Sequence, residues 1–190
     1  MGYILLLRAI NVGGRNRVDM AELKQQLADL GFTQVISYIN SGNLIFNSTL
    51  DRHQTRHTIQ NMFQDFYDFE LPFALISVTD FRQEYENLPD WWFLDNFYRQ
   101  NILFFLPAYF DTKPFELMEP AGERIHFGNL AVYWAVLDEM TYKRSSYVKI
   151  TGDAFYKQVT IRNLNTLKKL YELSENYEVK NSILKYLYVF

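Results

Sequence analysis

Arginine and asparagine side chains beside paired glycines are the residues of this sequence best suited to chemistry. Arg8 and Asn11 follow an apolar run, and Gly13 and Gly14 come shortly after them. A guanidinium group is a rigid fork of donors that matches a carboxylate or a phosphate. Glycines adopt positive φ and let backbone N–H groups approach a ligand closely. This stretch therefore predicts a site for a small anion.

A second stretch of the same kind lies in the last third of the chain. Arg162 and Asn165 repeat the Arg-x-x-Asn spacing of Arg8 and Asn11, and each pair ends a predicted strand and precedes a predicted helix. Helix N-termini add partial positive charge to such a site. The two stretches meet only if the strand ends that carry them face each other, and we expect them to share one site. The full set of predicted ligand-binding residues is Arg8, Asn11, Gly13, Gly14, Asn16, Ser41, Gly42, Asn43, Arg144, Arg162, Asn163 and Asn165.

The same residues also fit an ordinary structural role. Arginine at a strand end often pairs with a surface carboxylate, and Gly-Gly and Asn are common in turns. The Gly-Lys-Ser/Thr of a phosphate-binding loop is absent, and Gly13-Gly14 does not make a dinucleotide fingerprint. No nucleophile or general base can be named beside them. The sequence therefore does not decide whether the chain is an enzyme, and no cofactor is expected.

Composition excludes several other classes of protein. The chain has 190 residues, of which 48% are hydrophobic and 22% charged, enough for one large domain or two small ones. A formal net charge of −3 argues against a general binder of nucleic-acid backbone. The absence of cysteine excludes disulfides and thiolate sites. Without a signal segment or an apolar run of membrane length, we expect a soluble, cytoplasmic protein that does not bind a membrane.

Other clusters of titratable residues carry weaker signals. His53 and His57 have the i, i+4 spacing of a metal-binding pair on a helix. The sequence places no third ligand beside them and both are expected to face solvent, so we predict no metal site. Paired carboxylates such as Glu84 and Glu86 fit a solvated face.

Apolar periodicity predicts that the first 80 residues form one α+β unit. Asp19 and Glu22 have capping-box spacing at the start of a helix, and Gly31 stands where a helix commonly ends. Residues 40–43 (NSGN) are a strong hairpin signal. The predicted strands are 3–7, 35–39, 44–46 and 73–78, and the predicted helices are 20–30 and 51–68. Their order, β-α-β-β-α-β, is typical of a ferredoxin-like domain.

The pattern begins again near residue 102. Residues 127–130 (FGNL) echo residues 41–44 (SGNL), which suggests a duplicated unit, although Gly-Asn is common in turns. We predict strands at 102–106, 124–127, 130–136 and 159–161, a short helix at 112–118 and a basic helical segment at 143–150. The predicted fold is α+β, a tandem duplication of two ferredoxin-like (βαββαβ) subdomains plus C-terminal helices.

This interpretation divides the chain into four segments. They are subdomain 1 (1–80), a connector (81–100), subdomain 2 (101–162) and a C-terminal helical segment (163–190). In the connector, Trp91 and Trp92 either pack between the two halves or form an aromatic partner site. The last segment holds a helix at about 165–176. Its tail, 179–190, fits a helix packing back on the body or a partner-binding segment.

Three polar stretches resemble the signatures of a bacterial protein family. Residues 7–14 (LRAINVGG) and 38–46 (YINSGNLIF) closely resemble the N-terminal signature of the DUF1697 family, and residues 159–167 (VTIRNLNTL) resemble its second signature. The resemblance implies a tandem of ferredoxin-like subdomains and brings no established activity. The chain departs from the family at two positions, where the family usually has Gly in place of Ala9 and Trp in place of Leu164.

Three classes of function fit these observations. The first is binding of a small anionic ligand, phosphorylated or carboxylate, in a polar site between the subdomains. An enzyme of this class would transfer or hydrolyse a phosphoryl or acyl group, with arginine and asparagine stabilising developing negative charge. The second is binding of RNA or single-stranded nucleic acid to the aromatics of a sheet, against which the acidic net charge counts. The third is a protein-interaction module. The oligomeric state is not predicted.

Overall fold

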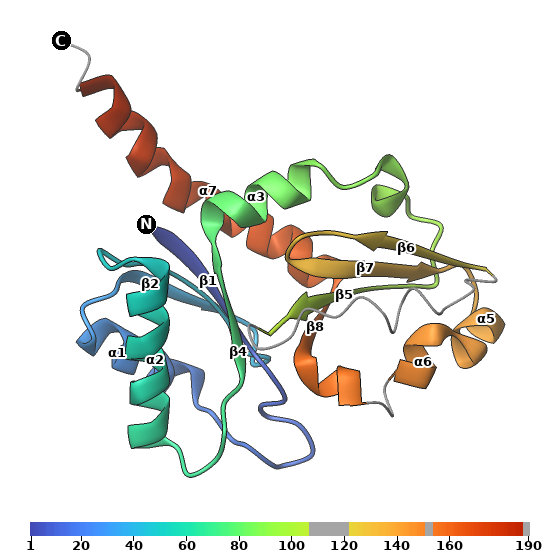
Figure 1. The fold of residues 1–190 in the computed structure, drawn as a ribbon, viewed down its shortest axis with the longest axis horizontal. Helices are drawn as coiled ribbons and strands as arrows, with labels where there is room; N and C mark the ends of the chain where they lie inside the picture. The colour runs from blue at the N-terminus through green and yellow to red at the C-terminus, as the bar shows by residue number, and fades with distance from the viewer. Residues whose placement is uncertain (107–121, 151–153, 188–190) are drawn as a thin grey trace. The chain divides into compact units, whose positions relative to one another are not determined.

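The structure is an α+β arrangement with two four-stranded antiparallel sheets (Figure 1). It is a computed structural model that describes residues 1–106, 122–150 and 154–187. Internal contacts divide the chain into unit 1, made of Met1–Gln83 and Lys169–Phe190, and unit 2, made of Glu84–Lys168. The helix predicted at 112–118 lies outside the described residues.

A four-stranded antiparallel sheet forms the centre of unit 1. Its strands are β1 (Gly2–Leu7), β2 (Thr33–Tyr38), β3 (Asn43–Asn47) and β4 (Phe73–Ser77). They lie in the order β2-β3-β1-β4, so the first strand of the unit is central. In this register Leu5 of β1 is opposite Leu44 of β3 and Leu75 of β4. All six residues of β1 are buried, which explains its uninterrupted apolar sequence.

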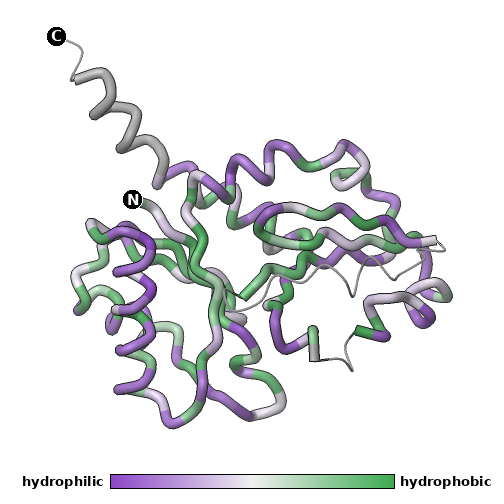
Figure 2. Tube along the Cα trace, viewed as in Figure 1, coloured by the Kyte–Doolittle hydropathy of each residue, from purple (hydrophilic) through white to green (hydrophobic). Residues whose placement is uncertain are grey.

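Two amphipathic helices pack on this sheet. They are α1 (Met20–Asp29) and α2 (Arg52–Phe66). Asp19 caps α1 by accepting from the N–H groups of Ala21 and Glu22, and Gly31 follows the end of this helix with a φ of 86°. Asp51 and Gln54 form a complete capping box on α2. In Figure 2 hydrophilic residues predominate along α2, and hydrophobic residues predominate along the strands of the sheet.

The core of unit 1 joins the inner faces of these elements. Leu23 and Leu27 of α1 and Ile59, Met62 and Phe63 of α2 are buried in the same cluster as residues of β1 and β3. By apolar periodicity Phe66 would also lie on the inner face of this helix, but the structure places it outside the core. Phe66 is the last residue of α2 and is 62% exposed.

Unit 2 contains the second antiparallel sheet. Its strands are β5 (Arg99–Phe105), β6 (Glu123–Phe127), β7 (Ala131–Val136) and β8 (Val159–Asn163). They lie in the order β6-β7-β5-β8, again with the first strand central and the second at an edge. Before this sheet lie α3 (Val78–Glu86), which crosses the boundary between the units, and the 3-10 helix η1 (Asp90–Phe93).

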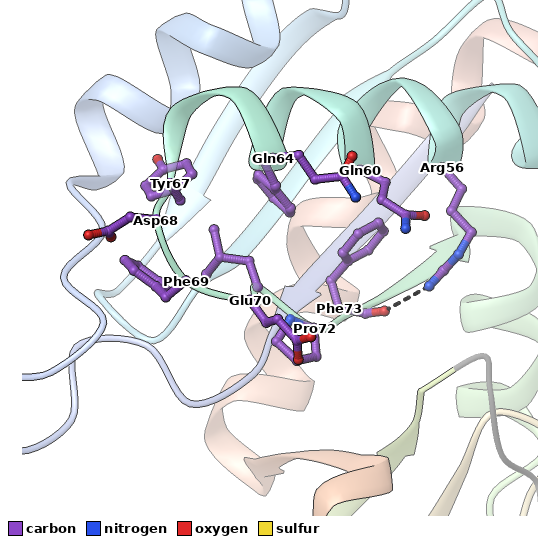
Figure 3. A pocket seen from close by; sticks show the side chains of 11 residues that line it. Arg56, Gln60, Gln64, Tyr67, Asp68, Phe69, Glu70, Pro72 and Phe73 are labelled. Atoms are coloured by element: carbon purple, nitrogen blue, oxygen red, sulfur yellow. Dashed lines mark hydrogen bonds between the residues drawn. The ribbon is translucent and has the colours of Figure 1, made fainter.

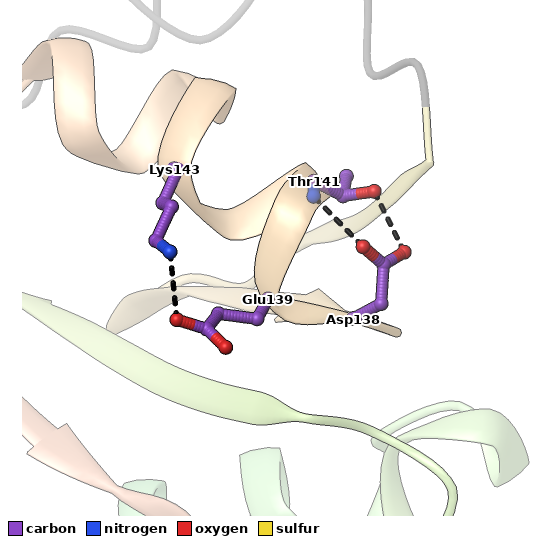
Figure 4. Close-up of polar contacts among 4 residues, drawn as sticks. All are labelled: Asp138, Glu139, Thr141 and Lys143. Atoms are coloured by element: carbon purple, nitrogen blue, oxygen red, sulfur yellow. Dashed lines mark hydrogen bonds and ion pairs between the residues drawn. The ribbon is translucent and has the colours of Figure 1, made fainter.

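The segment predicted as one helix at 143–150 is two short helices. These are α5 (Glu139–Arg144) and α6 (Ser146–Ile150), and the 3-10 helix η2 (Ala154–Gln158) follows them. Ser145 separates α5 from α6 because its backbone is extended, with a ψ of 158°. Asp138 caps α5 through two hydrogen bonds, from the backbone N–H of Thr141 (2.9 Å) and from its hydroxyl (2.8 Å) (Figure 4).

The chain ends in one continuous helix, α7 (Leu164–Leu187), where we had predicted a helix and a loosely assigned tail. Its residues from Lys169 onward belong to unit 1. Tyr177 of α7 donates a hydrogen bond to the backbone carbonyl of Gln34 and lies 3.3 Å from that of Ile45. The guanidinium group of Arg82 stacks on the ring of Tyr171, 4.2 Å from its centroid. These polar contacts fix the middle of α7 on unit 1.

Candidate functional site

The loop between β1 and α1 has an unusual backbone. Five of its residues have positive φ: Ala9 (53°), Asn11 (55°), Gly13 (58°), Gly14 (75°) and Asn16 (49°). Glycine and asparagine tolerate this conformation, whereas alanine is strained by its Cβ. Strained backbone of this kind persists only where the surroundings over-determine it, and it concentrates at ligand sites.

The paired glycines form a tight two-residue turn. Val12 and Arg15 pair as an isolated antiparallel bridge, and the N–H of Arg15 donates to the carbonyl of Val12 over 3.1 Å. Positive φ at both central residues identifies a type I′ turn, which explains why Gly13 and Gly14 stand there. Both glycines are exposed, and a Cβ at either would meet nothing within 4 Å.

Two asparagine side chains hold the loop in this shape. The amide of Asn11 donates to the carbonyls of Val18 (3.0 Å) and Asn40 (2.9 Å), and its oxygen accepts from the N–H of Val18 (2.9 Å). Asn16 donates to the carbonyl of Ala9 over 3.2 Å. Both residues were predicted to bind the ligand. The structure gives them hydrogen bonds within the protein that shape the loop.

The hairpin turn between β2 and β3 lies against this loop. The N–H of Leu7 donates to the carbonyl of Gly42 over 2.8 Å, and a Cβ on Gly42 would lie 2.6 Å from Cβ of Leu7. Asn43 is fully buried and donates to the carbonyl of Tyr38 and the hydroxyl of Ser41. The structure therefore brings the 8–16 stretch and the 41–43 stretch together within unit 1.

Three arginines belong to the loop. Arg8 is half-buried, and its backbone N–H donates to the carbonyl of Pro72 over 2.9 Å.

Arg15 and Arg17 are exposed, and neither forms an ion pair with any residue that the structure describes. The nearby carboxylate of Asp19 caps α1, and hydrogen bonds from the backbone of Glu22 and Ala21 hold its pKa below the usual range. We had not predicted Arg15 and Arg17 as site residues, although their position in the same loop was a usable signal.

The other predicted ligand-binding residues belong to unit 2. Arg144 is exposed at the end of α5, and Asn165 is exposed in the first turn of α7. Asn163 accepts from the N–H of Thr166 over 2.9 Å and so caps α7.

Arg162 is only 6% exposed, and its Nη1 donates to the hydroxyl of Thr160 and the carbonyl of Ile161, both over 2.8 Å. Burial lowers the pKa of Arg162 to about 10, so the side chain stays charged at neutral pH.

Among the described residues, neither a cluster of metal ligands nor a membrane-spanning helix is found. His53 and His57 are exposed on α2, and the structure groups no three His, Asp or Glu side chains within the described ranges into a metal site. Throughout the same ranges, no helix combines the length and the apolarity needed to cross a membrane.

Comparisons with known proteins give a family and a structural relative. The structure of the conserved bacterial protein SP0830 from Streptococcus pneumoniae matches with a TM-score of 0.85 and 39% sequence identity, over 91% of this chain and 98% of that one. No curated protein matches the chain. Residues 1–133, which include the whole 8–16 loop and the 41–43 turn, match a family described as "Protein of unknown function (DUF1697)". The chain therefore belongs to the DUF1697 family.

Proposed function

We propose that the chain binds a small anionic ligand, phosphorylated or carboxylate, at the exposed turn of residues 12–15 in unit 1. The observation that carries the proposal is the pair of adjacent backbone N–H groups on Gly13 and Gly14. Neither group makes a hydrogen bond within the described part of the chain. Successive backbone N–H groups in a turn can form a concavity that suits an anion.

Charge around the turn supports the same proposal. Arg15 follows the glycines directly and Arg17 lies two residues further, and their guanidinium groups can form paired hydrogen bonds to a phosphate or carboxylate. The hydrogen bonds of Asn11 and Asn16 fix the loop before a ligand arrives, which lowers the entropy cost of binding. Because the arginines are exposed, we expect binding to weaken as salt is added.

We further propose that the two units are copies of one ferredoxin-like (βαββαβ) unit. The matching strand orders, β2-β3-β1-β4 and β6-β7-β5-β8, support a duplication. The Gly-Asn-Leu hairpin shared by residues 42–44 and 128–130 supports it as well.

Complete burial of three strands argues against the nucleic-acid alternative. Ferredoxin-like RNA binders stack bases on aromatic side chains of an open sheet face. All residues of β1 and of β4 are buried, as are all residues of β7 in the second sheet. We therefore do not propose a nucleic-acid platform on either sheet.

Thermal unfolding with inorganic phosphate tests the anion site. We expect phosphate to stabilise the protein by about 2.7 kcal/mol at a hundredfold excess over Kd, relative to chloride at equal ionic strength. The double variant R15Q/R17Q should lose this stabilisation. The matched control R52Q removes an exposed arginine of α2 and should keep it. Equal stabilisation of wild type and R15Q/R17Q would refute the proposed site.

A further inference from the structure

A pocket of about 570 Å³ lies on unit 1 between α2 and the segment that leads into β4 (Figure 3). Its volume is within the usual range for small-molecule sites. Four aromatic rings line it, those of Phe63, Tyr67, Phe69 and Phe73. They meet edge to face, with ring centroids 5.4 Å apart for Phe63 and Phe73 and 5.7 Å apart for Tyr67 and Phe69. Such walls suit a flat, apolar molecule.

A guanidinium group closes one end of the pocket. Arg56 lies over the ring of Phe73, 4.5 Å from its centroid, and its Nη2 is 3.4 Å from the carbonyl oxygen of the same residue (Figure 3). Arg56 is half-buried and has no ion pair with any described residue. Burial lowers its pKa, and the neighbouring charge of Arg52 lowers it further. A partly desolvated cation without a counter-charge favours an anionic group on whatever fills the pocket.

Carboxylates mark the rest of the rim. Asp68 lies at the end opposite Arg56, beside Tyr67 and Phe69, and Glu70 lines the segment between the two ends (Figure 3). These negative charges repel any second anionic group on a ligand. The amides of Gln60 and Gln64 extend from α2 along the same pocket and supply neutral donors and acceptors.

We propose that this pocket binds a small aromatic monocarboxylate. The ring of the ligand lies against this row of aromatic side chains, and its carboxylate accepts from the guanidinium group of Arg56. The acidic rim selects against molecules with several negative charges, such as phosphorylated metabolites. This site shares no residue with the turn proposed above, so either proposal can fail without the other.

Calorimetric titration with indole-3-acetate and its neutral analogue indole-3-acetamide tests this proposal. We expect the acid to bind wild type and R52Q with the same Kd, and more tightly than the amide does. The variant R56Q should weaken the acid about tenfold or more and leave the amide unchanged, because only the acid has a charge-assisted hydrogen bond to lose. R52Q is the matched control, since it removes an equal charge one helical turn away.

Three results would overturn the proposal. They are equal affinities of acid and amide for wild type, an acid affinity that R56Q leaves unchanged, and no binding of the acid up to about 10 mM. If R56Q does not fold, the same titrations are made with R56K. Lysine keeps the positive charge at this position but lacks the planar fork of donors that arginine presents. Backbone amide resonances of Arg56, Phe69 and Phe73 must shift with indole-3-acetate, and inorganic phosphate must leave them in place.

Discussion

Two hairpin turns at equivalent positions of the two sheets are supported in different ways. In unit 1 the carbonyl of Gly42 accepts from the backbone of Leu7, and the glycine packs on the side chains of Leu7 and Ile10. In unit 2 Gly128 lies against the carboxylate of Glu84. That carboxylate accepts from the N–H groups of Asn129 (2.7 Å) and Leu130 (2.9 Å) and from the hydroxyl of Tyr133 (2.9 Å).

One sequence pattern is therefore stabilised by two different kinds of interaction. The turn at Gly42 is held by apolar packing and neutral hydrogen bonds, which do not titrate. The turn at Gly128 is held by a partly buried carboxylate. Burial raises the pKa of Glu84, although the hydrogen bonds that it accepts from Leu130, Tyr133 and Asn129 lower it in part. The stability of the second turn should therefore depend on pH, and that of the first should not.

The largest effect should come from Gly42→Ala. The new Cβ would lie 2.6 Å from Cβ of Leu7 and 2.9 Å from Cδ1 of Ile10, at a φ of 75° that alanine adopts with strain. We expect the free energy of unfolding in urea to fall by about 3 kcal/mol. Gly31→Ala is the matched control, because its φ is also positive and its Cβ would meet nothing within 4 Å. Equal losses in the two variants would mean that packing does not hold this turn.

The second effect in size should come from Glu84→Ala. This change removes the acceptor of three hydrogen bonds and leaves the hydroxyl of Tyr133, a residue only 1% exposed, without its partner. We expect a loss of about 2 kcal/mol in urea unfolding. A loss below about 0.5 kcal/mol would show that the carboxylate does not support the turn.

A smaller, stabilising effect should come from Ala9→Gly, in the loop on which the Gly42 turn rests. Ala9 has a φ of 53°, and glycine adopts this conformation without strain. We expect a gain of about 0.5–1 kcal/mol, seen as a higher Tm. A lower Tm would show that the loop does not impose this backbone conformation.

The smallest effect should be a difference in pH dependence. A raised pKa in the folded state means that the folded protein holds the proton of Glu84 more tightly than the unfolded chain does. The stability from this proton is complete below the usual glutamate pKa, and it is lost as pH rises through the raised pKa. The free energy of unfolding should be measured for wild type and Glu84→Gln from below the usual glutamate pKa to above the raised pKa. Only wild type should show this loss. Parallel pH profiles would contradict the account.

Local signals predicted much of the fold. The cap at Asp19, the glycine at position 31 and the hairpin at residues 40–43 each act within a few residues, so the sequence shows them directly. The break at Ser145 was not predictable in this way. The N–H and the hydroxyl of Ser146, the next residue, donate to Glu123 over 2.9 and 2.7 Å, a contact across 23 residues that no local pattern reveals.

Local patterns also failed to predict the surroundings of several candidate site residues. Arg8 and Arg162 have identical local spacing, yet Arg8 is half-buried beside a loop and Arg162 is almost fully buried in a strand. Glu84 was predicted to lie on a solvated face, which was wrong, because it turns toward a hairpin 45 residues away. The aromatic pocket beside Arg56 had no signature, since its walls combine a helix with the irregular segment that follows it. In each of these examples the environment of the side chain depends on burial or on contacts between residues distant in sequence, which local patterns do not show.

A titration of the isotope-labelled protein with inorganic phosphate, followed by amide NMR, tests the proposed anion site most directly. We predict that the amide resonances of Gly13 and Gly14 shift and saturate, and that the shifts shrink in R15Q/R17Q but not in R52Q. If phosphate leaves those two resonances in place at concentrations where others move, the turn at residues 12–15 is not an anion site.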